Sequence, residues 1–227
     1  FLKQYLKGKH IERAVEQAIN KEFLNRADAS TEEYTGNMIL VRNIVTKYIR
    51  QSIIPYDIAH NDFVVMELES KISHKFELGN GREVLIGGYA DRIDSLDNGN
   101  LRVVDYKTGK KALEFEGIES LFDGKKSLSN LLQTMLYSMI LQHKHKRNVE
   151  PSLYYVRNMQ SGDYNPRVID KQKGEVDYIS YAEEFEQLLR EKLAEIFNPD
   201  IPFTQCEAVS SDGGPCKYCD FKTICKR

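Results

Sequence analysis

The chain of 227 residues lacks the features that would place it in several large classes of protein. No apolar run approaches the roughly 20 residues that a helix needs to cross a bilayer, and no secretory signal peptide begins the sequence. The charge is nearly balanced, with 32 Lys and Arg against 34 Asp and Glu, which argues against a histone-like, non-specific nucleic-acid binder. We therefore expect a cytoplasmic globular protein that does not bind membranes and is long enough to bury a core.

Cysteine is absent from the first 205 residues and then occurs four times in the last 22. A secreted, disulfide-stabilised protein would spread its cysteines along the chain. The spacing here is C-x9-C-x2-C-x5-C, and a C-x2-C pair lets two thiolates reach one metal from a tight turn. This spacing favours a metal or iron–sulfur site over reduced surface thiols or a local disulfide; the four residues are Cys206, Cys216, Cys219 and Cys225.

Hydrophobic periodicity predicts a helical N-terminal part. Residues 10–25 and 31–54 both carry apolar side chains at helical spacing. A capping box at Ser30 is expected to start the second helix, and Pro55 is expected to stop it.

The centre of the sequence changes to β-strand patterns. Asn80-Gly81 and the turn at 97–100 separate β-rich runs, which predicts three or four antiparallel strands within 63–69, 71–78, 83–94 and 101–107. Helical periodicity then returns twice, with a further strand and a polar loop in between, over 127–143, 152–157, 162–173 and 178–197. The order predicts a mixed α/β fold with three parts: a helical segment (1–60), a core (61–200) and a cysteine-rich tail (201–227).

Two of the central strands carry a pattern of acidic and basic residues that suits metal chemistry. Asp105 and Lys107 are two apart in one strand, so they point to the same face about 7 Å apart. Asp91 lies 14 residues earlier across a turn, and antiparallel pairing can bring it beside Asp105. Two adjacent carboxylates repel unless a cation separates them, and Mg²⁺ accepts one or two carboxylates together with waters. Solvated side chains on two exposed strands are the simpler alternative.

These segments, "GGYADRID" and "VVDYKTGK", resemble the core of the PD-(D/E)xK nuclease superfamily, and specifically its RecB-like group. The resemblance implies a restriction-endonuclease-like core with a central mixed sheet flanked by helices. It implies Mg²⁺ or Mn²⁺ held by Asp91, Asp105 and the Tyr106 carbonyl, with Lys107 as the catalytic lysine. It also implies a Q-x3-Y element on the following helix, which Gln133 and Tyr137 match.

The cysteine spacing narrows the resemblance to AddB-type nucleases and related CRISPR-adaptation nucleases. In these proteins three C-terminal cysteines and one upstream cysteine hold a 4Fe-4S cluster. This sequence has no cysteine upstream of Cys206, so Cys206 could complete the set, and zinc on the four tail cysteines is an alternative. The family's G-x-x-x-H element is also missing, because His10 follows Gly8 too closely. Since the chain begins at Phe1, we expect the missing element to lie upstream.

The net charge of the chain is close to zero and would not attract DNA by itself. We therefore expect the DNA contacts to come from basic residues near the proposed site. Lys107 is followed by further cations that we predict to contact phosphates, at Lys110, Lys111, Lys125 and Lys126. The resemblance implies a metal-dependent DNA nuclease, of exonuclease type, in a helicase–nuclease system for end processing and recombinational repair. No Walker A motif occurs here, so a helicase motor or partner nuclease subunit must be supplied elsewhere. The alternatives are a catalytically inactive DNA-binding or scaffolding module of the same fold, and a zinc-ribbon tail on an unrelated core.

Overall fold

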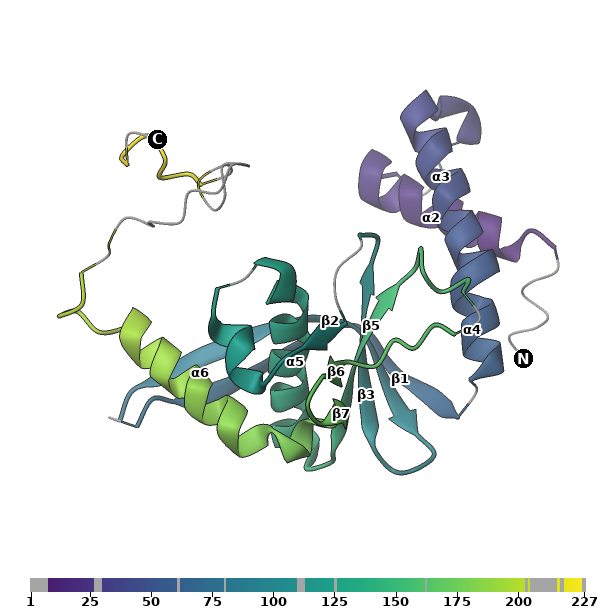
Figure 1. The fold of residues 1–227 in the computed structure, drawn as a ribbon. Helices are drawn as coiled ribbons and strands as arrows, with labels where there is room; N and C mark the ends of the chain where they lie inside the picture. The colour runs from purple at the N-terminus through teal and green to yellow at the C-terminus, as the bar shows by residue number, and fades with distance from the viewer. Residues whose placement is uncertain are drawn as a thin grey trace.

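The computed structural model describes residues 8–26, 30–60, 62–79, 81–109, 113–124, 126–161, 163–202, 204, 216 and 219–225. A helical part precedes a mixed four-stranded sheet, and further helices follow and intersperse the later strands (Figure 1). No helix of this described part is long and apolar enough to span a membrane. The predicted mixed α/β fold is therefore confirmed.

The described N-terminal residues begin with two helices, α2 (His10–Leu24) and α3 (Gly36–Tyr48). The apolar stripe of α2 packs with a tyrosine that precedes α3, in a small core of Ile11, Val15, Ile19 and Tyr34. The Tyr34 hydroxyl, 2.6 Å from Asn20 Oδ1, donates a hydrogen bond that ties this core to the end of α2.

The prediction of one helix over 31–54 is wrong at both ends. The capping box at Ser30 forms, but it starts only a 3₁₀ turn over Thr31–Glu33, and Thr35 then caps α3. At the other end the chain passes through a π-helical turn, Ile49–Ile53, into α4 (Ile54–Ala59), so Pro55 does not stop it. The π turn changes the hydrogen-bond register, and a proline in the first turn that follows removes no established α-helical bond.

The central sheet has the order β1-β2-β3-β5. Its strands are β1 (Phe63–Glu77), β2 (Glu83–Leu96), β3 (Leu101–Lys107) and β5 (Val149–Tyr155). The first three pair antiparallel, as the two turns predict, and β5 joins β3 in parallel. The two runs expected before residue 80 are one strand, because the pairing with β2 keeps one register from Glu67 to Glu77; the register shift lies earlier, at a β-bulge between Val65 and Glu67.

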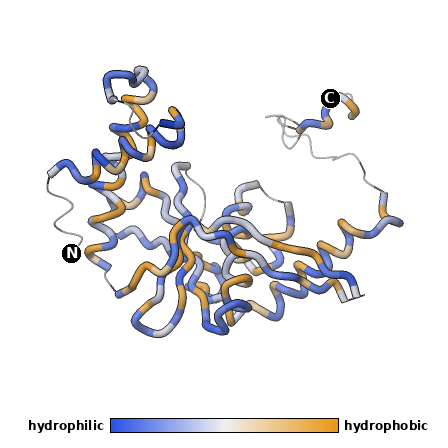
Figure 2. Tube along the Cα trace, turned by 180° about the vertical axis from the view of Figure 1, so that it is seen from behind, coloured by the Kyte–Doolittle hydropathy of each residue, from blue (hydrophilic) through white to orange (hydrophobic). Residues whose placement is uncertain are grey.

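The sheet is covered on both faces at β3 and β5, and β5 is buried along its whole length. One face packs against α5 (Ser129–His145), with α6 (Ala182–Ile196) outside it (Figure 1). The other face packs against the segment that contains α4. Orange, hydrophobic stretches run along the central strands in Figure 2, with bluer surface segments around them.

A second, smaller sheet joins β4 (Glu114–Phe115), β6 (Ile169–Asp170) and β7 (Gly174–Glu175). The polar run 162–173, expected to be a loop, therefore contributes a short strand. Main-chain bonds from Ile169 to Leu113 and from Lys171 to Phe115 hold it beside β4, which local polarity could not predict.

Candidate active site

Asp105 and Lys107 lie at the end of β3, on the face that packs against α5. The Lys107 ammonium is 2.5 Å from Asp105 Oδ2, as expected for two side chains that share a face. Asp105 is only 3% exposed, while the Lys107 side chain is 25% exposed. The carboxylate is therefore held inside the fold, and the ammonium extends toward the surface.

Asp91 reaches the same place from β2. The antiparallel register pairs Arg92 with Val104, and one further step puts Asp91 opposite Asp105. Asp91 Oδ2 accepts a hydrogen bond of 2.8 Å from the Tyr106 main-chain N–H. The Asp91 side chain thus accepts the main-chain hydrogen bond that a carbonyl of β2 would accept in a continuing ladder. The pairing of β2 with β3 therefore ends where the two carboxylates meet.

The electrostatics of this pair are unfavourable without a cation. Burial raises the pKa of Asp105 above its usual range; Lys107 opposes this, and the charge of Asp91 adds to it. Within the described residues, the buried Asp105 Oδ2 is paired with the Lys107 ammonium at 2.5 Å. Two facing carboxylates balanced by one lysine suit a hard divalent cation such as Mg²⁺ or Mn²⁺.

The site offers few protein ligands, so it suits a cation that keeps several of its water ligands. Among the described residues, no group of three or more His, Cys, Asp or Glu side chains converges on one point. Mg²⁺ is commonly bound through one or two carboxylates, and its remaining positions are filled by water or substrate.

The helix α5 holds Lys107 from the other side. Lys107 Nζ donates to Gln133 Oε1 at 3.2 Å, and Gln133 Nε2 donates to the Tyr137 hydroxyl at 3.1 Å. Gln133 and Tyr137 are one helical turn apart, so they share a face of α5. The structure thus brings all five predicted catalytic side chains into one continuous group.

A glycine in β2 makes room for this group. A Cβ atom at Gly88 would lie 2.5 Å from the Tyr137 hydroxyl, closer than side chains tolerate. The backbone of β2 therefore approaches Tyr137 directly, and Gly88 explains part of the "GGYADRID" pattern by packing rather than by chemistry.

The opposite face of the same strands carries a buried ionic network that the sequence analysis missed. The Arg92 guanidinium donates to Asp57 Oδ2 at 2.8 Å, to the Tyr106 hydroxyl at 2.8 Å and to Asp94 Oδ2 at 3.0 Å. Arg102 also donates to Asp94 Oδ2, at 2.8 Å. Arg92 and Asp94 are two residues apart in β2, and this spacing was the one sign of an ion pair in the sequence. The further partner of Arg92, Asp57, could not be predicted, because it is 35 residues away in α4.

Burial and ion pairing oppose each other in setting the pKa values of this network. Burial raises the pKa of Tyr106 to about 12, although the Arg92 charge opposes the shift. Burial alone would lower the pKa of Arg92, but its bonds to Asp57 and the charges of Tyr106, Asp57 and Asp94 raise it. Arg92 therefore stays charged, and it fixes Tyr106 between the two strand residues of the site, Asp105 and Lys107.

Several predicted contacts fall outside the described residues. Lys110, Lys111, Lys125 and Cys206 are among these, and of Lys126 only the backbone is described, in a 3₁₀ turn. Cys216, Cys219 and Cys225 are described and form no disulfide with one another. The Cys219 N–H bonds to the Cys216 carbonyl at 3.3 Å, which is the tight turn expected for a C-x2-C pair.

Comparison with known proteins gives one broad match. The family described as the PD-(D/E)XK nuclease superfamily matches residues 2–226. No curated protein matches the sequence. A solved structure titled "Crystal structure of SSO0001" has 14% sequence identity and a TM-score of 0.25, covering 89% of this chain and 95% of that chain. That structural likeness is too low to support any conclusion about function.

Proposed function

Because the chain belongs to the PD-(D/E)XK nuclease superfamily, we propose that it is a metal-dependent deoxyribonuclease whose site is built from Asp91, Asp105 and Lys107. The observation that carries this proposal is the convergence of two carboxylates and a lysine at the end of β3. Asp91, Asp105 and the Tyr106 carbonyl would hold Mg²⁺ or Mn²⁺. A cation bound there would polarise the phosphodiester and lower the pKa of a bound water.

The side chains of this site would orient the substrate and stabilise charge. Lys107, fixed by Asp105 and Gln133, would donate hydrogen bonds to a phosphate oxygen as negative charge develops on it. Gln133 is itself held by Tyr137, so the ammonium keeps one position. Hydrolysis would form a bond from the water oxygen to phosphorus and break the bond to the leaving sugar oxygen.

We expect wild-type protein to degrade linear or single-stranded DNA in Mg²⁺ or Mn²⁺ and not in EDTA. Lys107→Ala should lower the cleavage rate by about 10²- to 10³-fold, as for other groups that stabilise charge in the transition state. Lys75→Ala is the matched control, because Lys75 forms an exposed ion pair with Glu83 on another part of the sheet. Gel assays with a labelled substrate measure both rates. Equal rates for Lys107→Ala and the control would contradict the role of Lys107. No cleavage with either metal would favour the inactive DNA-binding alternative.

We also propose that the enzyme acts as an exonuclease with a helicase partner, in the processing of DNA ends for recombinational repair. The support is the resemblance of the cysteine spacing to AddB-type nucleases, together with the turn at Cys216 and Cys219. A 4Fe-4S cluster on the tail cysteines would fit that role, and Zn²⁺ is the alternative cofactor.

Anaerobic purification should give a brown protein that contains iron and sulfide. Thiolate ligands account for this expectation, because a C-x2-C turn presents two of them to one cluster. Elemental analysis and the visible absorption spectrum are the measurements, and Cys219→Ser should lower the iron content. A colourless protein with stoichiometric zinc would contradict the cluster.

A further inference from the structure

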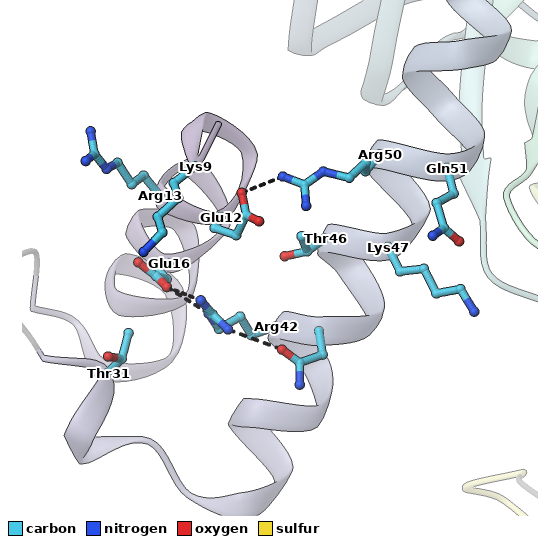
Figure 3. Close-up of a pocket in the computed structure, with 11 residues that line it drawn as sticks. Lys9, Glu12, Arg13, Glu16, Thr31, Arg42, Thr46, Lys47, Arg50 and Gln51 are labelled. Carbon is cyan, nitrogen blue, oxygen red and sulfur yellow. Dashed lines mark hydrogen bonds and ion pairs between the residues drawn. The ribbon is translucent and has the colours of Figure 1, made fainter. Parts of the chain in front are cut away.

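A polar cleft lies between α2 and α3, away from the catalytic group (Figure 3). Its volume is about 690 Å³. The α2 residues that line it recur at helical spacing, and the α3 residues continue into the π-helical turn at Arg50. Two regular helix faces therefore line the cleft from opposite sides.

The acidic side chains of the cleft are neutralised within it. Arg42 Nε donates to Glu16 Oε1 at 2.8 Å, and Arg50 donates to Glu12 Oε2 at 2.7 Å. Both pairs cross from one helix to the other, as Figure 3 shows. They join the helices and cancel the two negative charges.

Three further cations line the cleft with no partner among the described residues: Lys9, Arg13 and Lys47. All three are exposed, and in Figure 3 Arg13 and Lys47 extend outward on opposite sides. The lining therefore carries five cations and two carboxylates, a net charge of +3, on a chain whose formal net charge is −2. In addition, Thr46 Oγ1 and Arg50 Nε are buried there without a hydrogen-bond partner.

We propose that this cleft binds the phosphodiester backbone of DNA as a second contact site, outside the cleavage centre. Unpaired cations concentrated on a nearly neutral chain are the electrostatic feature that phosphates recognise. Among the described residues that line the cleft none is aromatic, so this lining offers no surface for stacking bases and would bind the backbone without reading sequence. This proposal rests on the proposed nuclease function, because the DNA strand held in the cleft would be the strand that the enzyme cleaves.

The end of α3, which lines the cleft, contacts the segment that follows β5 beside Lys107. Arg157 follows β5, and its Nε donates to the Tyr48 hydroxyl at the end of α3 at 3.2 Å. The Val156 N–H, one residue earlier, bonds to the Lys107 carbonyl at 3.1 Å. A strand held along α3 would therefore approach the end of β3 at which Lys107 lies.

The test compares DNA binding by two triple variants in EDTA, so that no metal-dependent cleavage occurs. Lys9→Ala, Arg13→Ala and Lys47→Ala together should weaken binding of a labelled oligonucleotide by about 10- to 100-fold near 0.1 M salt. They should also reduce the slope of log K against log salt by about 1 for each phosphate that is no longer neutralised. Fluorescence anisotropy over a salt series, with single-stranded and duplex DNA, gives both quantities.

The control carries the same change in net charge at three exposed sites elsewhere, Lys75→Ala, Lys171→Ala and Lys192→Ala. Equal affinity and slope in the two triple variants would overturn the proposal, and so would competition by polyglutamate as strong as by DNA of equal charge. If the cleft variant melts early, the single changes to glutamine replace it, and each should lower the slope by about 1. Because binding is measured without cleavage, the result can contradict DNA binding by the cleft without contradicting the proposed nuclease activity. A failure of the cleavage assay would likewise leave the binding result unaffected.

Discussion

Replacing Asp105 with asparagine is expected to abolish DNA cleavage and, at the same time, to stabilise the metal-free protein. The proposed cation loses one of its two carboxylates, and such an ion supplies several kcal/mol of transition-state stabilisation, or about 10²- to 10⁴-fold in rate. Single-turnover cleavage in Mg²⁺ and in Mn²⁺ measures the loss. Retention of activity within tenfold of the wild type would contradict the role of Asp105.

The gain in stability follows from the direction of the pKa shift. Burial, opposed by Lys107 and reinforced by Asp91, raises the pKa of Asp105 in the folded protein. The protonated carboxyl therefore favours folding at low pH, and this contribution is lost as the pH rises through the folded pKa. At pH 7 the buried charge opposes folding, and asparagine, which resembles the neutral acid, removes that cost.

Urea unfolding in EDTA at pH 7 is the measurement, and the difference between variant and wild type should shrink as the pH falls. Asp97→Asn is the matched control, because Asp97 is exposed in the turn after β2 and should change neither quantity. Added Mg²⁺ should stabilise the wild type more than Asp105→Asn, since only the wild type keeps both carboxylates. A variant that is less stable than the wild type at pH 7 would contradict the argument.

Much of the proposed site could be predicted because its geometry depends on short spacings, but the contact between Lys107 and Gln133, 26 residues apart, was implied only by the family resemblance. Asp105 and Lys107 share a face through the two-residue period of a strand, and Gln133 and Tyr137 through the turn of a helix. The approach of Asp91 to Asp105 needed only one reverse turn, at Gly99, where φ is +88°. These relations span at most one turn or hairpin, so local pattern is sufficient to predict them.

The features that the sequence analysis missed depend on contacts between distant segments. Glu12 and Arg50 are 38 residues apart, and their ion pair exists only because α2 and α3 fold back on each other. Helix α3 is likewise capped by Thr35 and not by Ser30. The hydrophobic periodicity of the sequence does not distinguish between these two possible caps. The capping box at Ser30 forms, but the choice of Thr35 as the cap of α3 could not be made from local signals alone.

The buried network behind the site is the second place where a large effect is expected. Arg92→Met should lower the free energy of unfolding by about 3–5 kcal/mol, because removing one member of a buried ion pair leaves an uncompensated charge. Asp94 keeps Arg102 as a partner, whereas among the described residues Asp57 keeps only the Tyr154 hydroxyl, at 3.5 Å. The cost should therefore fall mainly on Asp57. Urea denaturation followed by circular dichroism measures it.

Two further variants separate this explanation from a general loss of packing. Arg26→Met is the control, since the Arg26–Glu33 pair is exposed and should contribute less than about 1 kcal/mol. Arg92→Met combined with Asp57→Leu should recover part of the loss, because no unpaired carboxylate then remains beside Tyr106. If Arg92→Met costs no more than Arg26→Met, the network does not stabilise the fold. In that case the position of Tyr106, whose N–H binds Asp91, must be fixed by the strands alone.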